Sequence, residues 1–173
     1  NNTINKYSSE NIEILEGLEP VRKRPGMYIG GIDTKAILHL VVEILDNSID
    51  EVINNFATNI EVELLNDDTV QITDNGRGIP VDPHPKFKNK SALEIILTTL
   101  HSGGKFNSEN YQTSGGLHGV GASVVNALSD KFVIEVIREK KLYRQEYSKG
   151  LPITKLLKIS ETTKTNGTKV LFT

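Results

Sequence analysis

The chain has 173 residues, of which 37% are hydrophobic and 24% are charged, and its formal net charge is −2 at pH 7. This length suits one globular domain that buries roughly 70% of its unfolded surface, and the composition is too apolar for a disordered chain. Cysteine is absent, which excludes a disulfide scaffold, a thiol nucleophile and cysteine-ligated metal sites. The near-neutral charge argues against this chain being the main contact with nucleic acid.

The sequence shows no secretory signal, and no apolar run approaches the roughly 18 residues of a membrane span. We therefore expect a cytoplasmic protein without membrane contact. Because the chain starts at Asn1 rather than Met and stops directly after a strand-like segment, we expect it to be a fragment of a longer protein. Residues 1–173 contain neither a repeat nor a linker and are interpreted as a single domain, with residues 1–16 as an N-terminal arm that includes a short helix from about Ser9.

The first half of the chain predicts one long helix and one hairpin. Pro and Gly punctuate residues 23–31, which predicts a loop. Apolar residues spaced by three and four predict a helix over 34–54, with Asp33 as a candidate N-cap. The members of this apolar set are Ile37, Leu38, Val41, Ile44, Leu45, Ile49 and Val52. Alternation over 60–64 and 69–74, with a turn between, predicts a β-hairpin.

The second half predicts two helices and three strands. Residues 81–90 are expected to be irregular, and Ser91 is expected to cap a helix that ends near His101. The glycine-rich residues 102–121 predict a long loop, followed by a short apolar helix over 122–128. Strands are predicted over 132–138, 142–147 and 168–172. Together the elements predict an α+β fold, a two-layer sandwich in which helices cover one face of a mixed, mostly antiparallel sheet.

Polar side chains gather on one face of the predicted long helix. They are Glu43, Asn47, Asp50 and Glu51, with Asp46 beside them. A carboxylate one turn from an amide can serve as a base for water and as an oxygen ligand for Mg²⁺. His39 lies one turn before Glu43 and could orient it. Taken alone, the pattern also fits the solvated face of an amphipathic helix.

Two glycine-containing segments could hold a nucleotide. Asp74 ends a predicted strand and precedes two glycines, so its carboxylate could accept from the exocyclic amine of adenine beside backbone that a flat ligand approaches closely. The glycine-rich residues 114–121 run into a helix and could cradle phosphates, with Lys105 as a nearby cation. A plain turn and a mobile loop are the respective alternatives. The segment 165–168 carries hydroxyls that could bind a ligand or satisfy a turn.

Four segments carry these candidate residues: the polar helix face from Glu43 to Glu51, the segment that begins at Asp74, residues 114–121 and residues 165–168. In this order, they resemble the ATP-binding motifs of the superfamily shared by gyrase, Hsp90 chaperones, histidine kinases and MutL. Three longer motifs are similar to the ATPase subunit of bacterial type IIA topoisomerases, and the resemblance covers nearly the whole chain. These motifs are Arg24-Pro-Gly-Met-Tyr-Ile-Gly30, Leu100-His-Ser-Gly-Gly-Lys-Phe106 and Ser114-Gly-Gly-Leu-His-Gly-Val-Gly121. Residues 84–91 and 110–114 are more similar to the topoisomerase IV branch (ParE) than to the gyrase branch (GyrB).

The resemblance implies the Bergerat ATP-binding fold and ATP hydrolysis that drives DNA strand passage, with ATP as substrate and Mg²⁺ as cofactor. A gyrase subunit is the alternative, followed by another ATPase of the superfamily or a non-catalytic module gated by nucleotide. The family implies a homodimer closed by ATP, an A-type partner subunit (ParC or GyrA) and DNA contacts through regions outside this chain. A lysine from a further domain completes the family's site, so we expect this chain alone to bind nucleotide, stay mostly monomeric and hydrolyse ATP poorly.

The resemblance also implies roles for single residues. Glu43 would be the general base, supported by His39, and Asn47 would bind Mg²⁺. Asp74 would accept the adenine amine, with Thr168 assisting through an ordered water. Further nucleotide contacts would come from Gly78, Ile79, Lys105, Gly115, Gly116, Leu117, His118, Gly119, Val120 and Gly121, and Ile44, Ile72 and Val170 would line the adenine slot. An aminocoumarin pocket would include Glu51 paired with Arg77, together with Pro80 and Arg138, and Tyr111 would lie in the glycine-rich segment.

Overall fold

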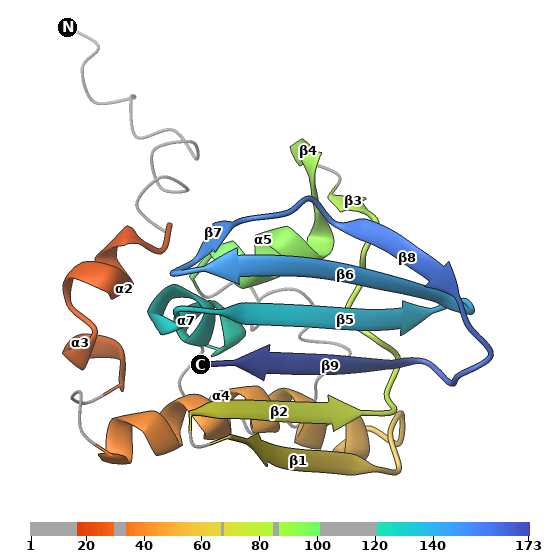
Figure 1. Ribbon diagram of the computed structural model, residues 1–173, viewed down its shortest axis with the longest axis horizontal. Helices are drawn as coiled ribbons and strands as arrows, with labels where there is room; N and C mark the ends of the chain where they lie inside the picture. The colour runs from red at the N-terminus through yellow and green to blue at the C-terminus, as the bar shows by residue number, and fades with distance from the viewer. Residues whose placement is uncertain (1–16, 30–33, 67, 85–86, 101–120) are drawn as a thin grey trace, which may run out of the picture.

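Helices and strands are arranged in two layers (Figure 1). The computed structural model describes residues 17–29, 34–66, 68–84, 87–100 and 121–173. One layer is a β-sheet, and the other holds three helices that cover one of its faces: α4 (Thr34–Ile53), α5 (Ala92–Thr98) and α7 (Gly121–Leu128). The shorter α2 (Glu19–Lys23) and α3 (Gly26–Ile29) lie beside one end of the sheet. The predicted two-layer α+β architecture is confirmed.

The order of strands in the sheet differs from their order in the chain. Across the sheet the strands are β1 (Ile60–Leu65), β2 (Thr69–Asp74), β9 (Gly167–Phe172), β5 (Phe132–Arg138), β6 (Lys141–Ser148) and β7 (Leu151–Pro152), and β8 (Leu157–Glu161) also pairs with β6. Every pair among these strands is antiparallel. Although β9 comes last, it lies between β2 and β5, where Val170 is opposite both Ile72 and Ile134.

The main apolar core lies between the sheet and the helices. Its buried members include Ile44, Ile72, Leu93, Val125, Ile134 and Val170. A second cluster joins α2 to α7 through residues such as Val21 and Val124. Full burial of each such side chain contributes roughly 1.5–3 kcal/mol relative to exposure. This core holds β2 and β9 side by side. It thereby fixes the position of the polar segment that follows β2. Within the described ranges, no helix is long and apolar enough to cross a membrane.

Most of the predicted elements are confirmed. The periodic segment 34–54 forms α4, and the alternating segments form the antiparallel hairpin of β1 and β2. Ser91 caps α5, because its Oγ accepts a hydrogen bond of 3.1 Å from the Glu94 N–H. The apolar segment 122–128 lies in α7, and the three predicted strands correspond to β5, β6 and β9. Asp33 and residues 1–16 lie outside the described residues.

Three local predictions are wrong. Residues 23–31 are not entirely a loop, because Gly26–Ile29 form α3, and proline before a helical turn is compatible with helix initiation. Residues 81–90 are not wholly irregular, because β3 (Pro83–His84) and β4 (Phe87–Ser91) form a short antiparallel pair. The helix after Ser91 ends at Thr98 rather than near His101, since Thr99 adopts an extended conformation.

The predicted apolar face of α4 is only partly buried. Ile44 belongs to the core, whereas Ile37 and Leu38 are 58% and 59% exposed and Val52 is 38% exposed. The helix packs on the sheet along β2, close to the sheet edge formed by β1. A helix at the edge of a sheet therefore buries a narrower stripe than the sequence periodicity suggested.

Candidate active site

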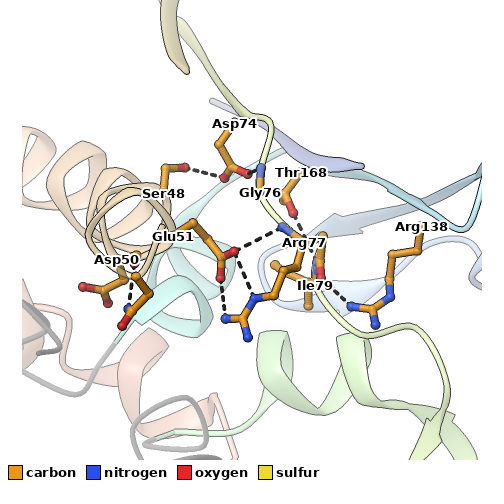
Figure 2. A network of polar contacts seen from close by, with 11 residues as sticks. Ser48, Asp50, Glu51, Asp74, Gly76, Arg77, Ile79, Arg138 and Thr168 are labelled. Carbon is orange, nitrogen blue, oxygen red and sulfur yellow. Dashed lines mark hydrogen bonds and ion pairs between the residues drawn. The ribbon is translucent and has the colours of Figure 1, made fainter. Parts of the chain in front are cut away.

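Asp74 is a buried carboxylate at the end of β2, and Figure 2 shows it facing Ser48 of α4. The Ser48 hydroxyl donates to Asp74 Oδ2 at 2.7 Å, and the Gly76 N–H donates to Oδ1 at 2.9 Å. Burial raises the pKa of Asp74 above its ordinary value, the two hydrogen bonds lower it, and the nearby Glu51 charge raises it. The result is an oriented acceptor next to the apolar core.

Two glycines allow the chain to pass close to this carboxylate. A Cβ on Gly76 would lie 2.7 Å from Glu51 Oε2 and 3.0 Å from Asp74 Oδ1. A Cβ on Gly167, the first residue of β9, would collide with the backbone oxygen of Asp74. The absence of side chains at both positions lets α4, β2 and β9 converge on Asp74.

Glu51 and Arg77 form a bidentate ion pair beside Asp74 (Figure 2). Arg77 Nη2 lies 2.7 Å from Glu51 Oε1, and Arg77 Nε donates to Glu51 Oε2 at 3.1 Å. The backbone N–H of Arg77 donates to the same Oε2 at 3.1 Å. The predicted pairing of these two residues is therefore present. Its planar geometry fixes the guanidinium in one orientation relative to α4.

The segment after Arg77 is held from the opposite side by β5 and β9. The Ile79 N–H donates to Thr168 Oγ1 at 3.2 Å, and Arg138 Nη1 donates to the Gly78 carbonyl oxygen at 2.6 Å. Gly78 has φ of +80°, a conformation that side chains disfavour. Thr168 is also opposite Asp74 in the β2–β9 pair. Pro80, which was also predicted for this pocket, is exposed, whereas Gly78, Ile79, Arg138 and Thr168 are partly buried.

Glu43 is a second buried carboxylate, located two turns before Glu51 on α4. It is 7% exposed, and its Oε2 accepts a hydrogen bond of 3.2 Å from the N–H of Gly121, which begins α7. His39 and Asn47, each one turn away, are exposed. In the described part of the chain, no group of three or more His, Cys, Asp or Glu could hold a metal ion. The amide oxygen of Asn47, one turn from the Glu43 carboxylate, is nevertheless a suitable ligand for Mg²⁺, because this ion needs few protein ligands when phosphate oxygens supply the rest.

The apolar residues predicted to line an adenine slot share one environment. Ile44, Ile72 and Val170 belong to the same buried cluster, and Ile72 is two residues before Asp74 on β2. The structure thus brings together Asp74, Thr168, Ile79 and this cluster. Lys105, Tyr111 and the predicted phosphate-binding residues from Gly115 to Val120 lie outside the described residues, so their placement stays a prediction.

Ser48 and Asn75 were not assigned roles from the sequence, although both organise the site. Ser48 is a small polar residue one turn after buried Ile44, a pattern that could have indicated an inward-facing hydroxyl. Asn75 Oδ1 accepts from the N–H groups of Thr58 and Asn59 at 2.8 and 2.9 Å. Its side-chain amide donates to Thr58 Oγ1 at 2.8 Å. Asn75 therefore ties the segment after Asp74 to the connection between α4 and β1.

Comparison with known proteins agrees with this geometry. Residues 32–173 match the model of the family described as histidine kinase-, DNA gyrase B-, and HSP90-like ATPase. The chain is 59% identical over 168 residues to the B subunit of DNA topoisomerase 4 from Rickettsia bellii, covering 97% of this chain and 25% of that protein. It is 53% identical over 167 residues to the B subunit of DNA gyrase from Thermotoga maritima, covering 96% of this chain and 26% of the relative. The chain thus spans about a quarter of these relatives.

Two solved structures share the fold. The 43K ATPase domain of Thermus thermophilus gyrase B, in complex with an aminocoumarin, has a TM-score of 0.79 and 46% identity, covering 93% of this chain and 40% of that one. The topoisomerase IV ATP-binding domain of Francisella tularensis, in complex with a small-molecule inhibitor, has a TM-score of 0.75 and 42% identity. That match covers 90% of this chain and 71% of the other.

Proposed function

The chain belongs to the histidine kinase-, DNA gyrase B- and HSP90-like ATPase family, and from this premise we propose that it binds ATP and hydrolyses it. Buried Asp74 is the observation that carries the proposal. Its two oxygens are oriented by Ser48 and Gly76, and the apolar side chains of Ile72 and Val170 lie beside it. A carboxylate can accept a hydrogen bond from the exocyclic amine of adenine, while the apolar cluster contacts the faces of the base.

In the proposed reaction Glu43 accepts the proton of a water molecule that attacks the γ-phosphorus in line with the leaving ADP. Its burial and its hydrogen bond to Gly121 N–H hold the carboxylate in one orientation. Asn47 on the same helix would hold Mg²⁺, which neutralises phosphate charge when bound. Thr168 and Ile79 would support the adenine side of the pocket, linked by their hydrogen bond of 3.2 Å.

We assign this activity to the ATPase domain of a bacterial type IIA topoisomerase, in which hydrolysis drives DNA strand passage in the cytoplasm. Identity of 55–59% to B subunits of topoisomerase 4, against 53% to that of gyrase, favours the topoisomerase IV branch. The proposed homodimer, the A-type subunit and DNA would be engaged by the longer protein. The chain alone is expected to be mostly monomeric and to turn over ATP slowly.

Titration calorimetry with novobiocin, an aminocoumarin, tests the binding site. We expect wild type to bind and Asp74→Ala to lose binding, because the variant removes the oriented acceptor. Asp68→Ala is the matched control, since this exposed aspartate lies just before the opposite end of β2. Absence of binding to folded wild type, or equal binding by Asp74→Ala, would contradict the proposed site.

A second variant separates an ATPase from a nucleotide-gated binding module. In the full-length protein, Glu43→Gln should retain binding of a non-hydrolysable ATP analogue while ATP turnover falls by about 10²–10⁴-fold, the usual contribution of a general base. Turnover and analogue affinity are measured on the same preparation. Turnover unchanged by Glu43→Gln would exclude Glu43 as the base.

A further inference from the structure

Phe56 is a large aromatic residue that lies outside both apolar clusters and is 45% exposed. It follows the C-terminal end of α4. The guanidinium Cζ of Arg77 lies 3.8 Å from the centroid of the Phe56 ring. This distance is well within the range of about 6 Å for an attractive cation–π contact. The ring therefore contacts the same guanidinium that pairs with Glu51.

The backbone at the end of α4 brings Phe56 to this position. The N–H groups of Phe56 and Ala57 both donate to the carbonyl oxygen of Glu51, at 2.8 and 3.0 Å. Asn55 has φ of 65°, the left-handed conformation that often ends a helix. The chain consequently turns back at Asn55, and the Phe56 ring is fixed relative to Glu51, the residue that pairs with Arg77.

Arg77 is thus restrained in two directions. Glu51 binds the edge of the guanidinium through Nε and Nη2, and Phe56 contacts its face. The Arg77 side chain still exposes 33% of its surface. Glu51 and Asp74 both lie close to Gly76, since a Cβ there would be 2.7 Å from Glu51 Oε2 and 3.0 Å from Asp74 Oδ1, and the Glu51 charge raises the pKa of Asp74. The contact of Glu51 with the edge of the Arg77 guanidinium and that of Phe56 with its face together fix the plane of this group beside Asp74.

We propose that Phe56 is a positioning residue that fixes the plane of the Arg77 guanidinium beside Asp74. This orientation favours flat, conjugated ligands that stack on the guanidinium. The proposal rests on the proposed function, because it takes Asp74 as the anchor of the ligand. Phe56 itself does not touch the ligand. Its effect passes through Arg77, which gives a test that a purely structural role would not satisfy.

The first test needs no ligand. In nuclear magnetic resonance spectra of the 173-residue chain, the ring current of Phe56 should displace the Arg77 Nε–H resonance upfield. Phe56→Leu should remove this displacement, and Phe56→Tyr should preserve it. An Arg77 resonance that is the same in wild type and Phe56→Leu would overturn the proposal. Phe56 is half-exposed, so both variants are expected to fold, which thermal unfolding checks.

The second test is a double-mutant cycle read by novobiocin titration. Phe56→Leu should weaken binding about two- to fivefold, the effect of losing a partly exposed cation–π contact, and Phe56→Tyr should restore it. In an Arg77→Ala background, Phe56→Leu should have no further effect. Leu151→Ala is the control, because Leu151 is an exposed apolar residue on β7.

Two binding results would contradict the proposal: unchanged affinity in Phe56→Leu, or equal weakening with and without Arg77. Wild type that binds neither novobiocin nor an ATP analogue would instead contradict the proposed function, and with it the ligand-selecting role of Phe56. In that case the Arg77 resonance still decides whether Phe56 positions the guanidinium. The two failures are therefore distinguishable.

Discussion

Two opposing effects act on the charge of the Asp74 carboxylate. Burial disfavours its charged form, whereas the Ser48 hydroxyl and the Gly76 N–H favour it. The net effect raises the pKa of Asp74 above its ordinary value of 3.8. Keeping the buried Asp74 carboxylate charged without a ligand costs free energy. A ligand amine that donates a hydrogen bond to it offsets part of that cost. The burial that reduces the stability of the free protein therefore favours ligand binding.

The raised pKa predicts a specific dependence of stability on pH. Between 3.8 and the raised value, the folded state holds the Asp74 proton more often than the unfolded state does. The contribution of Asp74 to the free energy of unfolding is therefore fully present below pH 3.8 and is lost as the pH rises through the pKa of the folded state. Asp74→Asn removes this loss, so its unfolding free energy relative to wild type should increase with pH across that window.

Urea unfolding over a series of acidic buffers measures this difference. Asp68→Asn, on an exposed aspartate, is the control for the general effect of removing a carboxylate. Parallel stability curves for wild type and Asp74→Asn would show that burial does not raise the pKa of Asp74. A relative stability that decreases with pH would mean that its hydrogen bonds outweigh burial.

The sequence predicted the charged members of the site better than the residues that orient them. Asp74, Glu51 and Arg77 were identified through motifs, and their proximity is present in the structure. Ser48 and Phe56 were not assigned roles, because a serine on a helix and an aromatic residue after it are ordinary in many contexts. Their importance comes from contacts across 26 and 21 residues of sequence, from Ser48 to Asp74 and from Phe56 to Arg77, which local patterns do not encode.

Among the helices and strands, sequence periodicity predicted those that are regular and determined by local sequence. α4 and the β1–β2 hairpin have clear periods and a short turn, so their sequences suffice. The edge strand β8 was not predicted, although Leu157 and Ile159 alternate with Lys158 and Ser160 as the apolar and polar residues of β1 do; all five residues of β8 are exposed. The central position of β9 was also beyond local reasoning, since it depends on pairing with β2 and β5, which are distant in the chain.

The approach of β9 to β2 gives a prediction about packing. Gly167→Ala places a Cβ against the backbone oxygen of Asp74, where no flexible side chain can move away. We expect a loss of about 1–3 kcal/mol of stability, typical of overpacking, together with weaker novobiocin binding, because the clash displaces Asp74. Thermal and urea unfolding measure the first effect, and calorimetry measures the second.

Asn166→Ala is the control for this substitution. Asn166 is the preceding residue and is exposed, so its replacement should change stability by no more than about 0.5 kcal/mol. Gly167→Ala with wild-type stability would show that β2 and β9 can separate locally at little cost. The requirement for glycine at the start of β9 would then be disproved.

The candidate site exists only when segments that are distant in the chain are assembled. Glu43, Ser48 and Glu51 come from α4, Asp74 from β2, Gly121 from α7 and Thr168 from β9. The sheet brings the last strand of the described chain against the second. A ligand that contacts these residues therefore binds the folded state and not the unfolded chain.

This assembly predicts that ligand binding stabilises global folding rather than one loop. At a free novobiocin concentration about 100 times its Kd, the folded state gains about 2.7 kcal/mol. For a chain of this size, that gain should raise Tm by roughly 5–11 °C. Scanning calorimetry should show one transition that shifts as a whole, and Asp74→Ala should show no shift. A second, unshifted transition would mean that part of the described chain unfolds independently of the site.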